Sequence, residues 1–154
     1  MAELTKASTS RTVETARGTI HYQEAGEGYP LILMHGSGAG ATGWVNFSNN
    51  IAELAEQFHV YAVDCEGWGD TYTTTFEQSD HVQMHIDFMD ALGIEKAALV
   101  GNSMGGITAI RLFVRGEVPG LDADGFATAA AGAKENCPVS QALKAVPIEL
   151  TILD

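Results

Sequence analysis

The stretch AALVGNSMGG (residues 97–106) places Ser103 between an apolar run and a helix-compatible segment. A Gly-x-Ser-x-Gly sequence at a strand-to-helix junction is typical of a nucleophilic serine exposed on a sharp turn. Gly101 and Gly105 supply the small neighbours that this strained backbone needs. We expect the backbone N–H of Met104 to point at a developing oxyanion, at the positive end of the following helix. The alternative is a Gly-rich turn that only packs a helix close to a strand.

A second Gly-rich turn, His35–Gly38, follows the apolar run YPLILM at residues 29–34. Small residues let the backbone approach a carbonyl oxygen, so the N–H of Ser37 or Gly38 would be the second oxyanion donor. Such a turn alone carries little information. Together with the turn at Ser103, it predicts an oxyanion hole.

Strand-like and helix-like segments alternate around these turns. They predict two antiparallel strands within 12–26, strands at 29–36, 59–67 and 96–103, and helices at 44–58, 80–92 and 104–113. This order predicts an α/β fold, a mostly parallel sheet with helices on both faces and with ligands at the carboxyl ends of its strands. The apolar stripes expected on the first two helices are Phe47, Ile51, Leu54 and Phe58, and Val82, Ile86, Met89 and Leu92.

The composition is that of one globular domain, because 45% of the 154 residues are apolar and 18% are charged. A net charge of −12 argues against nucleic acid and membrane surfaces as partners and favours a small-molecule substrate. Residues 1–10 contain no apolar core of a signal peptide, and the cysteines Cys65 and Cys137 form no disulfide framework. We therefore expect a cytoplasmic protein that needs no cofactor and no metal.

Four segments carry a family resemblance: HGSGAGATGWVNFSNNI (35–51), VYAVDCEGWGDT (60–71), DALGIEKAALVGNSMGG (90–106) and ITAIRLF (107–113). Over residues of about 11–113, the chain resembles the α/β-hydrolase fold. More narrowly, it resembles the meta-cleavage-product hydrolases, which split carbon–carbon bonds in vinylogous 1,5-diketones. The resemblance implies hydrolysis of ester or carbon–carbon bonds in small acyl or diketone substrates, and it allows a homo-oligomer.

The resemblance also assigns roles to residues of this chain. The nucleophile is Ser103, the oxyanion hole is Ser37, Gly38 and Met104, and the substrate-binding positions are Gly36, Asn46 and Asn102. In the family the serine is followed by an acid and then by a histidine. Here all five histidines precede it, namely His21, His35, His59, His81 and His85. We therefore predict an incomplete triad.

None of these histidines fits the role of base. His35 belongs to the oxyanion turn, and His59 starts a strand at the end opposite the serine. His81 and His85 are four residues apart on a helix, which could hold a metal, although a solvated face is the simpler interpretation. Asp64 is expected to fix a loop.

The segment 114–154 has a different texture and lacks a hydrolase lid. It resembles the carboxy-terminal end of the osmotically inducible protein C and organic-hydroperoxide-resistance family, in which the position of Cys137 is the second cysteine of a redox pair. We expect a flexible segment 1–10, a hydrolase-like part 11–113, and a helix–strand tail that completes the same domain and ends at the acid-like Asp154.

Two other functions compete with a serine hydrolase. One is a non-catalytic scaffold, either truncated or a chimera of two families. The other is a thiol-dependent hydroperoxide reductase acting through Cys137. Nothing in the sequence indicates a lowered pKa for that thiol, so its structural interpretation is favoured.

Overall fold

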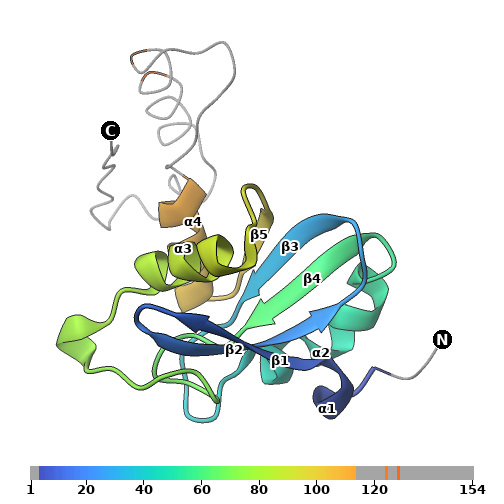
Figure 1. Ribbon diagram of the computed structural model, residues 1–154, viewed down its shortest axis with the longest axis horizontal. Coiled ribbons are helices and arrows are strands. Elements are labelled where there is room, and N and C mark those ends of the chain that lie inside the picture. The colour runs from blue at the N-terminus through green and yellow to red at the C-terminus, as the bar shows by residue number, and fades with distance from the viewer. Residues whose placement is uncertain (1–3, 114–123, 125–127, 129–154) are drawn as a thin grey trace. The chain divides into compact units, whose positions relative to one another are not determined.

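The computed structural model describes residues 4–113, 124 and 128 (Figure 1). The chain divides into two units, Met1–Ile110 and Arg111–Asp154, and the sheet belongs to the first. The strands are β1 (Ser10–Thr15), β2 (Gly18–Ala25), β3 (Tyr29–Met34), β4 (Phe58–Val63) and β5 (Ala98–Gly101). The helices are α1 (Lys6–Thr9), α2 (Gly43–Leu54), the 3-10 turn η1 (Phe76–Gln78), α3 (His81–Leu92) and α4 (Met104–Phe113).

The strands form one mixed sheet in the order β1-β2-β4-β3-β5. The pairs β1–β2 and β2–β4 are antiparallel, and β4–β3 and β3–β5 are parallel, which confirms the α/β class and the N-terminal antiparallel pair. In this register Met34 lies beside both Val63 and Gly101. The carboxyl ends of the three parallel strands therefore meet at one edge, and the turns after Met34 and Gly101 are neighbours.

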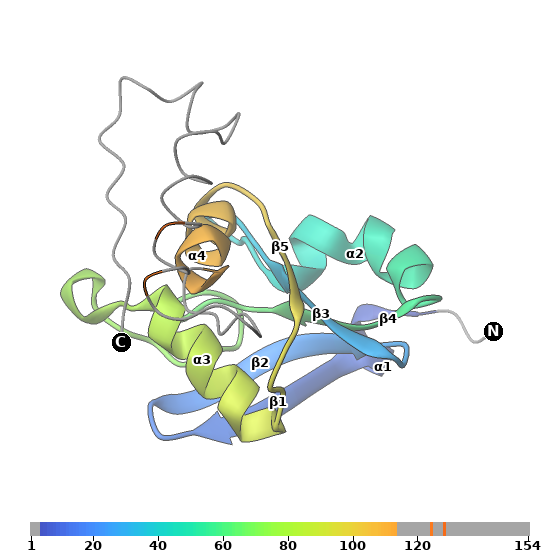
Figure 2. The ribbon, with the colours of Figure 1, turned by 90° about the horizontal axis from the view of Figure 1, so that it is seen from above.

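Helices cover both faces of the sheet, as predicted (Figure 2). On one face, α2 packs into a buried cluster made of Ala25, Leu31, Leu33, Val60 and Ala62 from the strands and Phe47 and Ile51 from the helix. On the other face, Phe88 of α3 meets Tyr22 and Tyr61 edge-on, with ring centroids 5.1 Å and 5.9 Å away. Tyr61 and its neighbours along β4 point to opposite faces, so the two helices lie on opposite sides.

The predicted buried face of α3 is wrong. The helix buries Met84, His85 and Phe88. The predicted residues, Val82, Ile86, Met89 and Leu92, are only partly buried. Both rows lie within one broad apolar arc of the helix, and periodicity alone does not rank them. The row that contains Phe88 is buried because Phe88 is the residue that reaches the strand tyrosines.

Two boundaries also differ from the prediction. The helix α2 ends at Leu54, and Phe58 reaches the same apolar cluster from the start of β4. Residues 1–10 are not flexible throughout, because α1 begins at Lys6 with a capping box and Thr9 is buried. The hydroxyl of Thr9 donates to Gln23 Oε1 at 2.6 Å, which ties this segment to β2.

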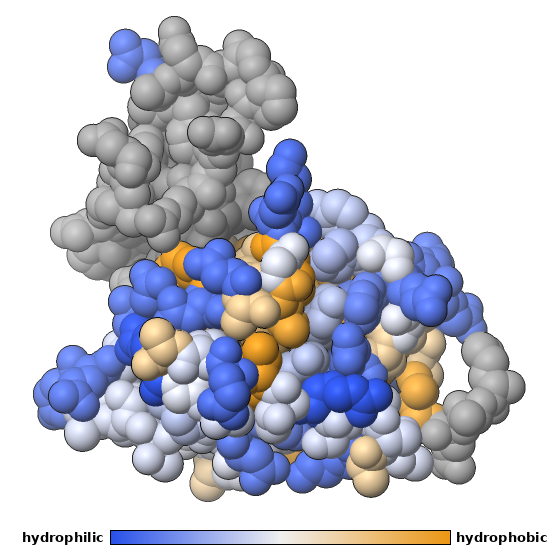
Figure 3. Space-filling model, in the orientation of Figure 1, coloured by the Kyte–Doolittle hydropathy of each residue, from blue (hydrophilic) through white to orange (hydrophobic). Residues whose placement is uncertain are grey.

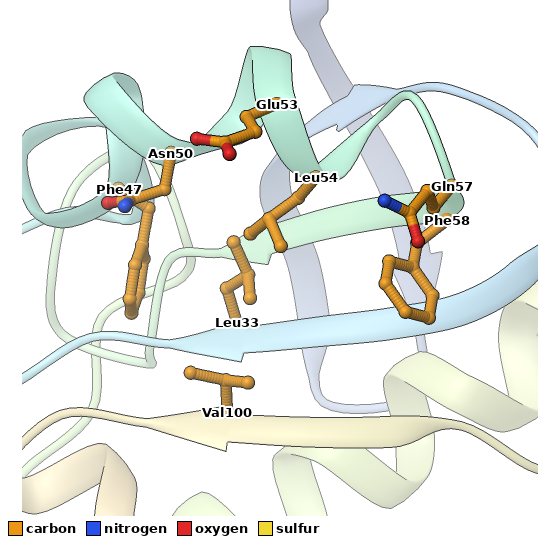
Figure 4. A pocket seen from close by; sticks show the side chains of 8 residues that line it. All are labelled: Leu33, Phe47, Asn50, Glu53, Leu54, Gln57, Phe58 and Val100. Atoms are coloured by element: carbon orange, nitrogen blue, oxygen red, sulfur yellow. The ribbon is translucent and has the colours of Figure 1, made fainter.

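Strand β5 is not buried on both faces as expected, because it lies at the edge of the described sheet and Val100 is 45% exposed. A groove runs beside it under α2 (Figure 4), lined by Leu33, Phe47, Asn50, Glu53, Leu54, Gln57, Phe58 and Val100. Apolar side chains also gather near the centre of the face seen in Figure 3.

In the part of the chain that the structure describes, no helix has the length and apolar character needed to cross a membrane.

Candidate active site

Ser103 lies on a strained turn between β5 and α4. Its φ of 54° is the only positive value among the described non-glycine residues. A Cβ on Gly101 would collide with the carbonyl of Gly105, and one on Gly105 would collide with the carbonyl of Met34. A left-handed conformation costs a non-glycine residue about 1–3 kcal/mol and persists only where the surroundings impose it. The local geometry is therefore a strained turn between a strand and a helix, with an exposed serine.

The second predicted turn lies directly beside it. The N–H of Asn102 donates to Met34 O at 3.0 Å, and a Cβ on Gly36 would lie 3.1 Å from Ser103 Cβ. This proximity explains why glycine occupies position 36. Gly38 has a φ of 147°, and its carbonyl accepts from Trp68 Nε1 at 2.9 Å. The turn is thus held from a third loop, which the sequence analysis did not anticipate.

The three predicted substrate-binding residues, Gly36, Asn46 and Asn102, are brought together. The Nδ2 of Asn102 donates to Asn46 Oδ1 at 2.9 Å, and the N–H of Gly36 donates to the same oxygen at 3.4 Å. Asn46 Nδ2 in turn donates to the carbonyl of Thr42 at 3.3 Å. The two amides therefore form a fixed polar wall beside Ser103.

His35 supports the turn after β3 from the interior of the fold. It is fully buried, its Nδ1 is 2.7 Å from Gly36 O, and the N–H of Cys65 donates to its Nε2 at 2.9 Å. Since a carbonyl can only accept and a backbone N–H can only donate, the proton of the neutral ring lies on Nδ1. Both nitrogens are engaged, so His35 has a structural role, and its predicted place in this turn is confirmed.

None of the other histidines is hydrogen-bonded to Ser103. His21 contacts Ser10 and Asp64, and His59 contacts Glu24 and Tyr61. In the described residues, each of these two histidines is therefore engaged with partners other than Ser103.

The expected solvated face of His81 and His85 is wrong. His85 is fully buried, and burial lowers its pKa from 6.5 to about 4. His81 is half-buried against the Trp68 ring, and desolvation lowers its pKa too. Within residues 4–113, 124 and 128, no group of three His, Cys, Asp or Glu side chains is placed to hold a metal ion.

Asp64 fixes loops, as predicted. Its Oδ1 accepts from the N–H of Gly43 at 2.7 Å, and its Oδ2 lies 2.8 Å from His21 Nδ1. A Cβ on Gly69 would collide with the same carboxylate. One buried side chain thus joins the end of β4 to the start of α2, to β2 and to the loop after β4.

Glu66 is a buried anchor that the sequence analysis missed. It is fully buried and accepts from Tyr72 Oη at 3.0 Å, from Ser79 Oγ at 3.1 Å and from the N–H of Asp80. Arg17 Nη2 lies 3.5 Å from its Oε2. Desolvation and the hydrogen bond to Glu66 raise the pKa of Tyr72 to about 12. This carboxylate holds the loop between β4 and α3, and the only sequence signal was an acidic residue inside a Gly-rich turn.

The two cysteines lie in different parts of the chain. Cys65 is buried, and desolvation, followed by the charges of Asp64 and Glu66, raises its pKa to about 12, so it is a neutral thiol. Cys137 and Asp154 lie outside the described residues, as does the rest of the segment 114–154 apart from residues 124 and 128.

Comparison with known proteins agrees with this geometry. The sequence model of a protein family, described as "Alpha/beta hydrolase family", matches residues 31–150. A 2-hydroxy-6-oxononadienedioate/2-hydroxy-6-oxononatrienedioate hydrolase of Paraburkholderia phymatum is 44% identical over 115 residues, which cover 69% of this chain and 40% of the relative. The same enzyme of Burkholderia vietnamiensis is also 44% identical over 115 residues. The chain thus spans about two fifths of the length of the curated relatives that it matches.

Solved structures show the same similarity. The 2-hydroxy-6-oxo-6-phenylhexa-2,4-dienoate hydrolase of Rhodococcus sp. strain RHA1 is 31% identical with a TM-score of 0.62, over 68% of this chain and 41% of that one. A serine hydrolase involved in carbazole degradation is 38% identical with a TM-score of 0.65, over 68% of this chain and 42% of that one. The family match and the strand–turn–helix geometry lead to one conclusion: this chain belongs to the alpha/beta hydrolase family.

Proposed function

We propose that this chain acts as a serine hydrolase on ester or carbon–carbon bonds of small acyl or diketone substrates, with Ser103 as the nucleophile. The observation that carries the proposal is the φ of 54° at Ser103, on a turn packed against Gly36. Strain of this kind at a serine has a use where the hydroxyl must face a substrate. The meta-cleavage-product and dienedioate hydrolases among the relatives support the diketone class.

In the proposed reaction, Ser103 Oγ attacks the carbonyl carbon, and the negative charge develops on the carbonyl oxygen. Met104 and either Ser37 or Gly38 would stabilise that charge through backbone N–H groups. Asn102 and Asn46, linked at 2.9 Å, would bind polar substituents of the substrate. Such preorganised donors are worth about 100- to 1000-fold in rate.

The proton of Ser103 also needs an acceptor, and we propose that the triad is incomplete in these residues. The five histidines of the chain are held by other partners, among them Asp64, Glu24 and the Gly36 carbonyl. Without a base, the oxyanion donors still assist, so activated esters with good leaving groups are the expected substrates. We expect neither a metal nor a cofactor in this reaction.

The test is hydrolysis of a short activated aryl ester by the purified protein and by its Ser103→Ala variant. We expect the wild-type protein to hydrolyse the ester faster than Ser103→Ala, because the variant keeps the backbone donors but has no nucleophile. Ser48→Ala removes a partly buried serine on α2 and serves as the matched control, with an unchanged rate. Equal rates for wild type and Ser103→Ala would exclude the nucleophile and favour the non-catalytic scaffold.

A meta-cleavage-type diketone, supplied in the same assay, tests the finer substrate class. Carbon–carbon cleavage that depends on Ser103 would support it, whereas cleavage of the ester alone would limit the proposal to esters. The thiol-dependent alternative rests on Cys137, because the raised pKa of Cys65 leaves that thiol unreactive. The chimeric origin and the domain boundary near residue 113 likewise stay proposals.

A further inference from the structure

A second serine, far from Ser103 in the sequence, has the partners that Ser103 lacks. Ser10 Oγ lies 2.9 Å from His21 Nε2, and His21 Nδ1 lies 2.8 Å from Asp64 Oδ2. Both distances are in the range expected between a nucleophile and its base, and between that base and its orienting acid. A Ser–His–Asp arrangement is recognised by these roles and not by sequence position.

The sheet register explains how the three residues meet. His21 of β2 pairs with Thr12 of β1, and Ser10 lies two residues away on the same face of β1. Asp64 immediately follows β4, the strand on the other side of β2. The constellation therefore joins β1, β2 and the residue that follows β4.

The hydrogen bonds also fix where the proton lies. The Asp64 carboxylate accepts the N–H of Gly43 at 2.7 Å through Oδ1, which leaves Oδ2 to accept from His21 Nδ1. A carboxylate oxygen accepts, so the tautomer of His21 that acts as a base has its proton on Nδ1. Its Nε2 is then an acceptor, and the hydroxyl of Ser10 donates to it.

Exposure separates Ser10 from its two partners. His21 and Asp64 are 4% and 2% exposed, whereas Ser10 is only partly buried. Of the three residues, only the serine is therefore partly open to solvent. The chemistry available to such a serine is attack on an activated electrophile, with the imidazole taking the proton.

We propose that Ser10, backed by His21 and Asp64, is a second nucleophile that activated acyl and phosphonyl or phosphoryl electrophiles modify covalently. With a fluorophosphate, Ser10 Oγ forms a bond to phosphorus as the P–F bond breaks and fluoride leaves. The hydroxyl proton passes to His21 Nε2 and then to water. The product is a phosphorylated Ser10, and no oxidant or cofactor is required. The inference is independent of the function proposed for Ser103.

The test treats the Ser103→Ala protein with diisopropyl fluorophosphate and maps the label by peptide mass spectrometry. Trypsin releases residues 7–11, which contain both Ser8 and Ser10. Ser8 is exposed and its hydroxyl is hydrogen-bonded to Thr5, so it is an internal control without an imidazole. General-base assistance is worth about 100-fold or more, so we expect the label on Ser10 to exceed that on Ser8 by that factor.

Equal labelling of the two serines, or no label on either, would overturn the proposal. His21→Gln removes the base while keeping a polar side chain, and we expect it to bring Ser10 down to the Ser8 level. A folded His21→Gln protein that is labelled as fast as its parent would also overturn it. If that variant does not fold, the comparison of Ser8 with Ser10 in the parent still decides.

Discussion

Ser103 lies on a strained turn at the edge strand β5, whereas Ser10 lies in extended backbone at the start of β1. The first is exposed beside the Gly36 turn, where two backbone donors are expected. The second has an imidazole and a carboxylate in line behind it. One serine thus lies where oxyanion donors are expected, and the other has the partners that we propose to remove its proton.

The two serines are positioned by different means. The turn at Ser103 is made by a local sequence, because Gly101 and Gly105 alone permit it. The arrangement at Ser10 depends on strand pairing, because its three members are 11 and 43 residues apart along the chain. Substitutions at Ser103 and in the Ser10 arrangement should therefore affect the stability of the protein in different ways.

The largest effect is expected from removing the acid of the Ser10 arrangement. Asp64→Ala leaves His21 and the N–H of Gly43 buried without their acceptor, which should lower the unfolding free energy by about 1–3 kcal/mol for each group. Urea unfolding followed by circular dichroism measures it. Asp70→Ala removes an exposed carboxylate from the same loop and should change stability by less than about 0.5 kcal/mol. Equal losses of unfolding free energy in the two variants would mean that the hydrogen bonds of Asp64 do not stabilise the fold.

A second effect concerns a histidine that has no acid. His21 has its carboxylate, but in His85 Nδ1 is 2.7 Å from the His81 carbonyl, and Nε2 is buried with no described partner. Its folded pKa of about 4 lies below the ordinary 6.5, so the unfolded chain binds more protons between these values. Stability should therefore fall with decreasing pH from about 6.5 to about 4, by about 3 kcal/mol in total.

His85→Leu should remove most of this slope, which unfolding at a series of pH values would show. The measurement also gives the pH range in which the protein is folded, and labelling of Ser10 must be done within that range. An unchanged slope in His85→Leu would assign the pH dependence to another group, such as His81.

The turns at Ser103 and after Met34 could be predicted because their signal is local. Glycines at fixed spacing, an apolar run before them and a helix after them predict the turn, and parallel pairing brings the turn after Met34 alongside. The buried network of Glu66 and the arrangement at Ser10 gave no such signal. Both join segments far apart in the chain, and their contacts depend on a strand register that composition and periodicity do not determine.

The errors have the same physical origin. The buried row of α3 was mistaken because several rows of that helix are apolar, and only the position of Phe88 over two tyrosines selects one. The interior position of His85 was missed because its polarity suggested solvent. Strand β5 was expected to be buried because apolar runs suit central strands, but Val100 is at an edge in the described sheet.

The smallest effect is the most direct test of the difference between the two serines. Alanine and glycine both remove the hydroxyl, so the difference between them reports on the backbone alone. At Ser103, where φ is 54°, Ser103→Gly should be about 1 kcal/mol more stable than Ser103→Ala, because glycine adopts the left-handed region without strain. At Ser10, where φ is −64°, the order should reverse, with Ser10→Gly about 1 kcal/mol less stable than Ser10→Ala. Urea midpoints of the four variants give both differences, and the same sign at both positions would mean that the turn at Ser103 is not strained.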